Sequence, residues 1–303
     1  MTLLLLLAFL SLAACGKKGP PTLKAYEKPE KPSNLTAIHR ERKIILSWSY
    51  PGDLRSSVKG FEVLRSEGKG FERRAFVESD QSFFEDGEFD VNVSYGYKVV
   101  AENLKGVLST DSDTITVAPK PLPLPPTDVR FAVKSDAVEL SWKRSGEDVC
   151  YNIYKSMEKG RYGKVSLNRE PVCGAVFRDT SMLPERTVYY TFTALHNTPL
   201  KDEGFHSGEV VVTPADFVPS PPSELSTVKT DERVYLVWKE SPDTWVKGYR
   251  VYRKREGEEV SMLLGEARTP TFVDKEKSEK KTWYMIRAVG PSSESQPVTI
   301  EVP

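Results

Sequence analysis

The residues that could carry chemistry are few and lie far apart in this 303-residue chain. His196 and His206 flank Asp202 and Glu203, a set of side chains that could hold a metal ion. Zinc sites, however, are built from tightly spaced His and Cys ligands, so an exposed polar loop is the other interpretation and the one we favour. The remaining histidine, His39, is expected to be a solvated turn residue. The sequence therefore predicts no metal site and no cofactor.

Other signals of catalysis or nucleic-acid binding are missing from the sequence. It contains no Gly-rich phosphate loop, no zincin motif and no nucleophile elbow. Lys plus Arg equal Asp plus Glu at 43 each, without a block of like charge, which argues against a nucleic-acid partner. With 39% hydrophobic residues the chain is expected to fold. We therefore expect a folded protein that is not an enzyme.

Of the three cysteines, Cys15 lies near the N-terminus, whereas Cys150 and Cys173 lie in the middle of the chain. Cys15 ends an apolar run, residues 3–14, that is too short to cross a bilayer, since a spanning helix needs about 20 apolar residues. It has the length of a signal-peptide core. In an oxidising compartment Cys150 and Cys173 are expected to form a disulfide, with two free thiols as the alternative. A bridge would close a loop of about 22 residues and contribute about 3 kcal/mol to stability.

The sequence LAAC at residues 12–15 resembles the lipobox of bacterial lipoproteins. The resemblance implies that residues 1–14 are a signal peptide and that the sulfur of Cys15, the mature N-terminus, carries a diacylglycerol. Gly16, in place of the Asp that retains enterobacterial lipoproteins in the inner membrane, implies the outer membrane. An ordinary secretory leader is the alternative. Residues 15–31 are polar and Pro-rich, which is typical of a semi-rigid tether.

Prolines and repeated segments mark three domains. Thirteen of the 22 prolines fall in the tether region and in two stretches, 119–126 and 214–222. The segments IILSW, VELSW and VYLVW end at tryptophans 94 and 96 residues apart, and YKVVA, YTFTA and YMIRA end at alanines 93 and 94 residues apart. A shared, domain-sized period predicts domains at 32–118, 125–214 and 221–303.

Each copy is predicted to consist of strands. Apolar residues occupy every second position in the segments that end at Trp48, Trp142 and Trp238, as expected of half-buried strands. Similar alternation follows in GFEVLR, CYNIYK and GYRVYR, and again in the Tyr-rich segments that end in Ala. Several short strands per copy, without a long helical pattern, predict an antiparallel sandwich.

The order of these motifs resembles that of fibronectin type III domains. Each copy has a Pro-x-x-apolar opening, a strand ending in Trp, the Gly-Tyr-x-Val-Tyr-Arg-like strand, a Phe-x-Asp motif and a Tyr-rich strand ending in Ala, over about residues 32–303. The resemblance implies an all-β chain of three tandem immunoglobulin-like antiparallel β-sandwiches. It also implies a tyrosine-corner hydrogen bond for Tyr95, whereas Val188 and Thr282 stand at the equivalent places of the other copies.

Two features distinguish single copies. In the second copy Cys150 takes the place of Gly60 and Gly248, and it is expected to point outward, while Cys173 follows the hairpin of a C′ strand. In the third copy Trp245 lies in the loop after the Trp-ended strand. An exposed aromatic there would mark a contact surface. The alternative is that Trp245 covers its own domain edge or the linker, since Trp prefers burial.

The sequence thus predicts a non-catalytic envelope protein, attached to the membrane by its N-terminal lipid, that binds an envelope protein or glycan or acts as a spacer. A second hypothesis rests on CGKKGPP, residues 15–21, which resembles the start of small Gram-negative lipoproteins linked to maturation of the lipopolysaccharide transporter. It implies an accessory role in outer-membrane assembly. A third is a carbohydrate-directed accessory module, because such domains often accompany glycosidases. The fold does not decide among them.

Overall fold

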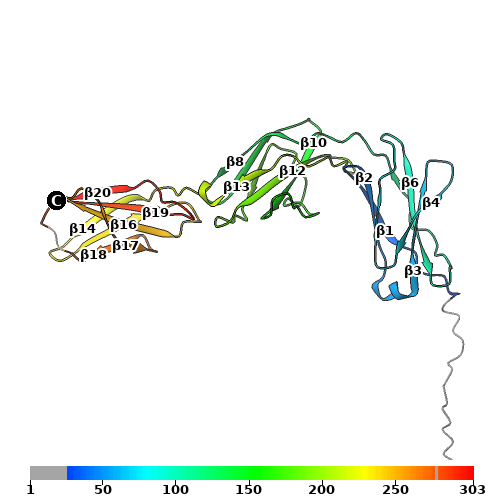
Figure 1. The fold of residues 1–303 in the computed structure, drawn as a ribbon, viewed down its shortest axis with the longest axis horizontal. Helices are drawn as coiled ribbons and strands as arrows, with labels where there is room; N and C mark the ends of the chain where they lie inside the picture. Colours follow the sequence, from blue (N-terminus) through cyan, green and yellow to red (C-terminus); the bar gives the residue numbers. More distant parts are fainter. Residues whose placement is uncertain (1–25, 277–278) are drawn as a thin grey trace, which may run out of the picture. The chain divides into compact units, whose positions relative to one another are not determined.

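The fold is seen in a computed structural model that describes residues 26–276 and 279–303. The leader, Cys15 and the first part of the tether lie outside the described residues. Within the described ranges the regular elements are twenty strands and two short 3-10 turns, η2 (Gly52–Ser57) and η3 (Pro214–Asp216), without an α-helix (Figure 1). Strand pairing is antiparallel from β2–β5 to β19–β20, and an isolated parallel bridge joins Arg40 to Glu203. The predicted all-β fold class is confirmed.

The first sandwich, blue to cyan in Figure 1, combines a three-stranded and a four-stranded sheet in the orders β1-β2-β5 and β4-β3-β6-β7. Its strands are β1 (Ser33–Arg40), β2 (Lys43–Ser49), β3 (Val58–Ser66), β4 (Glu72–Glu78), β5 (Phe83–Asp86), β6 (Tyr95–Asn103) and β7 (Ile115–Val117). The rings of Trp48 from β2 and Phe61 from β3 meet edge-on at 5.6 Å, so the two sheets pack against each other. The main-chain amide of Asp90 donates to the hydroxyl of Tyr95 over 2.7 Å, which is the expected tyrosine-corner bond.

The second sandwich, in green, has two three-stranded sheets in the orders β11-β9-β8 and β10-β12-β13. Its strands are β8 (Thr127–Val133), β9 (Val138–Lys143), β10 (Val149–Ser156), β11 (Val176–Asp179), β12 (Val188–His196) and β13 (Val210–Val212). The C′ strand expected before Cys173 is therefore absent from this sheet. Residues 157–175 run from β10 to β11 as a loop that contains one isolated bridge, from Val172 to Tyr151.

The third sandwich, yellow to red, repeats the three-plus-four arrangement in the orders β14-β15-β18 and β17-β16-β19-β20. Its strands are β14 (Ser223–Lys229), β15 (Val234–Lys239), β16 (Gly248–Arg255), β17 (Met262–Ala267), β18 (Thr271–Asp274), β19 (Thr282–Val289) and β20 (Val298–Val302). In this sandwich, as in the others, the alternating apolar residues predicted from the sequence form the core. Leu236, Trp238, Tyr249, Val251 and Ile286 are all buried.

The chain divides into two compact units. One contains the described residues up to 38 together with residues 43–119, and the other contains residues 39–42 and 120–303. The second and third sandwiches thus belong to one unit. The domain limits 32–118, 125–214 and 221–303 stay a prediction, although the three groups of strands fall inside them.

The residue near the start of the central strand differs between the wider and the narrower sheets. A Cβ atom added at Gly60 of β3 would lie 2.2 Å from the carbonyl oxygen of Val77 in β4. At Gly248 of β16, where φ is +156°, it would lie 2.7 Å from the carbonyl oxygen of Ala267 in β17. The fourth strand therefore approaches too closely for any side chain. Cys150 stands at this position in β10, where no fourth strand is present.

Candidate binding surfaces

One buried carboxylate that receives several hydrogen bonds recurs at the same position in each sandwich. It is the Asp of the Phe-x-Asp motif, and it meets a basic residue and a tyrosine from the opposite sheet. The three sets are Asp86–Arg65–Tyr97, Asp179–Lys155–Tyr190 and Asp274–Arg253–Tyr284. The tyrosine hydroxyl donates over 2.6–2.8 Å and the basic group over 2.7–3.0 Å. These groups join the two sheets.

The sequence motifs contained these residues, but their interaction was not predicted. The basic residue is the last of each GFEVLR-like segment, and the tyrosine begins the alternation of the strand that ends in Ala. A basic residue at the same position in all three copies is the signal that could have revealed the set. Every member is engaged within its own sandwich, which favours a structural role over catalysis.

The electrostatics of the three aspartates follow from this geometry. Burial by itself raises the pKa of each carboxyl, but hydrogen bonds outweigh this effect. They come from Arg74, the main-chain amide of Glu88 and Tyr97 for Asp86, from Lys155, Ser181 and Tyr190 for Asp179, and from the main-chain amide of Glu276, Arg253 and Tyr284 for Asp274. The pKa of each aspartate consequently lies below its ordinary value of 3.8. Burial and the adjacent carboxylate raise the pKa of the three tyrosines.

These shifts predict how stability depends on pH. Because the folded-state pKa of each aspartate is lowered, its contribution is present in full above about pH 5 and is lost as the pH falls through the folded value. We expect the free energy of unfolding, measured by urea titration, to fall steeply below about pH 4. The triple variant Asp86→Asn, Asp179→Asn, Asp274→Asn should have a lower free energy of unfolding at neutral pH. That free energy should also decrease less steeply as the pH falls. An unchanged slope in that variant would contradict the assignment.

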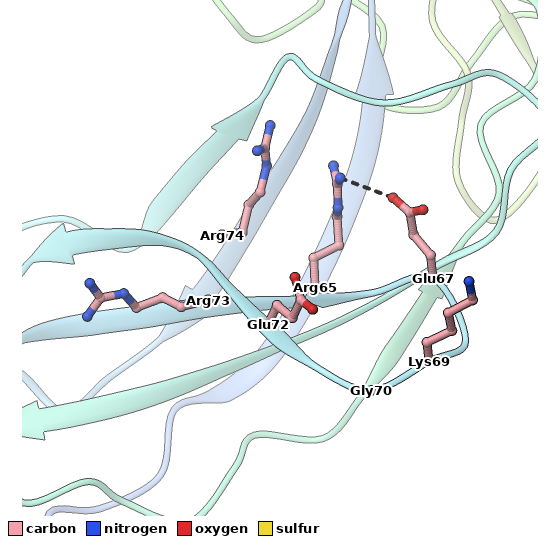
Figure 2. A pocket seen from close by; sticks show the side chains of 7 residues that line it. All are labelled: Arg65, Glu67, Lys69, Gly70, Glu72, Arg73 and Arg74. Atoms are coloured by element: carbon pink, nitrogen blue, oxygen red, sulfur yellow. Dashed lines mark hydrogen bonds and ion pairs between the residues drawn. The ribbon is translucent and has the colours of Figure 1, made fainter.

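A charged pocket of about 300 Å³ lies at the hairpin between β3 and β4. Figure 2 shows the residues that line it, which are Arg65, Glu67, Lys69, Gly70, Glu72, Arg73 and Arg74. Its arginines already have partners: Arg65 contacts Glu67 at 3.2 Å and Arg73 contacts Glu62 at 3.1 Å. Arg74 donates to both carboxylate oxygens of Asp86, the buried aspartate of this sandwich.

The chemistry of this pocket is ion pairing. An incoming anion would compete with carboxylates of the same sandwich for each arginine, and it would meet Glu72 as well. Hydrogen bonds to Asp86 and Glu88 raise the pKa of Arg74, so this group stays charged and cannot act as a base. The pocket is therefore a weak candidate for binding an anion.

A second group of buried charges lies in the unit that contains residues 39–42 and 120–303. His39 is only 1% exposed, and its Nδ1 atom lies 2.8 Å from Oδ1 of Asp202. The same carboxylate oxygen accepts the main-chain amide of Lys120 over 2.8 Å. The expectation that His39 is a solvated turn residue is therefore wrong. Burial raises the pKa of Asp202, but the hydrogen bonds from His39 and Lys120 lower it by more. The pKa of Asp202 therefore lies below its ordinary value.

Glu203, next in the chain, is fully buried and fully hydrogen-bonded. Its Oε1 atom accepts from Asn152 over 3.0 Å, from Tyr154 over 2.7 Å and from Thr193 over 2.5 Å, while Arg40 donates to Oε2 over 2.7 Å. These bonds outweigh the effect of burial and hold the pKa of Glu203 below its ordinary value. A carboxylate with this many partners stabilises the surrounding fold and is not accessible to a ligand.

His196 and His206 do not hydrogen-bond to Asp202 or Glu203 through their side chains but contact other groups. His196 Nε2 lies 3.1 Å from the carbonyl oxygen of Pro121, and His206 packs against the rings of Tyr154 and Tyr162. Across residues 26–276 and 279–303 no three His, Cys, Asp or Glu side chains gather closely enough to hold a metal ion. The same ranges contain no helix whose length and hydrophobicity would suit a bilayer-spanning segment.

Cys150 and Cys173 form a disulfide in the structure, with Cα atoms 4.0 Å apart. Cys150 is buried and Cys173 is exposed. The bridge fastens the loop of residues 157–175 to the beginning of β10. Beside it, the side chain of Asn168 accepts the amide of Ile153 and donates to the carbonyl oxygen of Tyr151. Together they occupy the edge that a fourth strand covers in the other two sandwiches.

Removing this bridge should destabilise the second sandwich. We expect the double variant Cys150→Ser, Cys173→Ser to lose about 3 kcal/mol of unfolding free energy, because the unfolded chain regains the entropy of an open loop. Hydrogen exchange of β10 amides in the full chain measures the loss. Reducing the parent protein should reproduce it. If alkylation of the unreduced, denatured protein labels both cysteines, the bridge is not formed.

Trp245 lies in a contact between sandwiches of the same unit. It is 9% exposed and belongs to the buried cluster around β9, β10 and β12. Its ring meets that of Phe217 edge-on at 5.3 Å, and its Nε1 atom donates to the carbonyl oxygen of Lys134 over 3.3 Å. The side chain is therefore occupied within the chain and is not a free contact surface.

Comparisons with known proteins add little to this description of the fold. No family model matches the chain, and no curated protein matches it. Among solved structures, the FN1–FN3 domains of chicken CNTN1 share 16% identity, with 90% of this chain and 98% of that chain covered and a TM-score of 0.29. A segment of two fibronectin type III domains from chicken tenascin shares 15% identity, with 59% and 99% covered and a TM-score of 0.45. The fold assignment therefore depends on the strand order described above.

Proposed function

We propose that this chain is a lipid-anchored, non-catalytic protein of a bacterial envelope, in which fibronectin type III-like sandwiches bind a partner or hold it at a distance from the membrane. The observation that supports the proposal most is the sequence LAAC at residues 12–15, followed by a Pro-rich tether and three sandwiches. The buried polar sets described above also support it, because their members hydrogen-bond to one another within each sandwich, as expected of groups that stabilise a fold.

Anchoring through Cys15 predicts a clear result in cells. Several acyl chains on one residue hold a protein firmly on a membrane, whereas a chain without them stays in water. We expect Cys15→Ser to abolish incorporation of a labelled fatty acid and to move the protein from the membrane fraction to the soluble fraction. Cys150→Ser, the matched control, should keep the label. A labelled, membrane-bound Cys15→Ser protein would refute the anchor.

The binding role calls for a separate test. In-cell crosslinking of the anchored chain should recover a specific envelope protein, or a glycan array should identify a carbohydrate. If neither gives a specific partner, the spacer role remains as the simpler function. A partner lost only when the sandwiches are removed would assign binding to them.

The segment GKKGPP, residues 16–21, supports one rival, an accessory role in assembly of the lipopolysaccharide transporter. Replacing this segment by an unrelated linker of equal length keeps Cys15 and the sandwiches intact. Loss of transporter maturation with normal anchoring would favour the accessory role. Normal maturation would favour a tether without a signal of its own.

A further inference from the structure

The outer edge of β10 is only partly covered by the loop of residues 157–175. The main-chain groups of Tyr151 exchange hydrogen bonds with Val172 in both directions over 2.9 Å. Ile153 is also satisfied, because its amide donates to Asn168 and its carbonyl oxygen accepts from Leu167 over 2.7 Å. Up to Ile153, then, the loop and its disulfide replace the missing strand.

After Ile153 the loop no longer pairs with the outer edge of β10. Main-chain groups along a strand alternate in direction, so the amide and carbonyl of Lys155 face the same side as those of Tyr151 and Ile153. In the part of the chain that the structure describes, no main-chain hydrogen bond joins Lys155 to the loop. At the equivalent positions of the other sandwiches, Arg65 pairs with Glu72 of β4 and Arg253 pairs with Met262 of β17.

An apolar groove of about 510 Å³ lies beside this open edge. It is lined by Lys155, Ser156, Met157, Val165, Ser166, Leu167 and Leu183. Three of these apolar side chains are unusually exposed: Met157 at 54%, Val165 at 86% and Leu183 at 39%. Apolar side chains gathered at a sheet edge are typical of a site that receives another chain.

The loop beside the groove carries more basic than acidic residues, although the ammonium of Lys155 is paired with Asp179 and Glu209 accepts the main-chain amide of Gly160. Between Glu158 and Glu170, which are the two acidic residues of this stretch, the loop carries four basic residues, Lys159, Arg161, Lys164 and Arg169. Glu158 is already paired with Arg161 at 2.9 Å. A ligand that carries carboxylates next to its apolar side chains would therefore complement the groove.

From these observations we infer that the groove beside Lys155 binds an extended segment of a partner protein, with apolar residues at alternate positions and Asp or Glu between them. The segment takes the place that β4 and β17 occupy in the other sandwiches: its main chain pairs with Lys155, and its apolar side chains contact Met157, Val165 and Leu183. This inference deepens the binding role proposed above and rests on it.

The test uses random octapeptides displayed on phage, selected on the full chain and counter-selected on its Val165→Asp variant. Val165 is exposed, so the variant should fold, which circular dichroism checks. The selected peptides should alternate apolar residues with Asp or Glu. Their affinity should fall at least tenfold for Val165→Asp and Leu183→Asp. The matched control Val260→Asp, at a 77% exposed position in the third sandwich, should leave affinity unchanged.

Two further measurements complete the design. N-methylation of the peptide amide that pairs with Lys155 should also lower affinity at least tenfold, because it removes a main-chain donor. The inference is overturned if no peptide survives counter-selection, if N-methylated peptides bind equally, or if Lys-rich peptides are selected. It is also overturned in favour of a second copy if the chain self-associates and Val165→Asp abolishes that association. None of these readouts requires the lipid anchor, so failure here is distinct from failure of the anchoring experiment.

Discussion

Replacing Asp274 by alanine is expected to lower the free energy of unfolding of the third sandwich by about 3–5 kcal/mol. The side chain of Arg253 is only 3% exposed, and its guanidinium donates to Asp274 over 2.7 Å. The hydroxyl of Tyr284 and the amide of Glu276 donate to the same carboxylate. Without it, a buried cation keeps only the exposed carboxylate of Glu276, and a buried hydroxyl loses its acceptor. Hydrogen exchange of β16 and β19 amides measures the loss.

A surface aspartate provides the matched control. Asp136 pairs with Arg178 over 2.6 Å, but both side chains are about half exposed. Such a pair contributes about 0–1 kcal/mol, so Asp136→Ala should change stability little. If Asp274→Ala costs no more than this control, the buried set is not a source of stability.

Trp245→Ala should give the second large effect, a loss of about 3–5 kcal/mol from the unit that contains the second and third sandwiches. The substitution removes the indole from the buried cluster that includes Phe217 and leaves a cavity, and it removes the hydrogen bond to Lys134. Urea unfolding followed by circular dichroism measures the loss. Hydrogen exchange should show it near Phe217 and in the loop that contains Trp245.

A partly exposed tryptophan tests whether burial causes that loss. Trp283 of β19 has an intermediate exposure, and its Nε1 atom donates to Glu301 at the surface. Trp283→Ala should therefore be clearly less destabilising than Trp245→Ala. Equal losses would show that the contact around Trp245 does not stabilise the unit.

The core could be predicted because its signal is local. Alternation along a strand places every second side chain inside, so Ile44, Leu46 and Trp48 could be assigned to the core from seven consecutive residues, and the structure buries all three. The repeat then extended the same assignment to the other two copies. The fold class could therefore be predicted from the sequence.

The burial of single polar residues could not be predicted in this way. His39 interacts with Asp202, 163 residues further along the chain, and no local pattern connects the two. Trp245 was placed in the correct loop, and its contact with Phe217 in the connection between sandwiches agrees with the alternative that it covers the linker, but its hydrogen bond to Lys134 of the second sandwich was not predicted. The groove beside Lys155 was missed because the sequence was expected to form a C′ strand there.

The fourth strand passes close to the main chain of Gly60 and of Gly248, so the residue at this position is related to the width of the sheet. At Gly60 and Gly248 an added Cβ atom would overlap a carbonyl oxygen of the fourth strand, so a side chain there would require that strand to move away. In this chain, the copy with Cys150 is the one whose sheet stops at three strands. Within this chain, then, glycine accompanies the four-stranded sheet, and the bulkier cysteine instead ties down the loop that takes the place of the fourth strand.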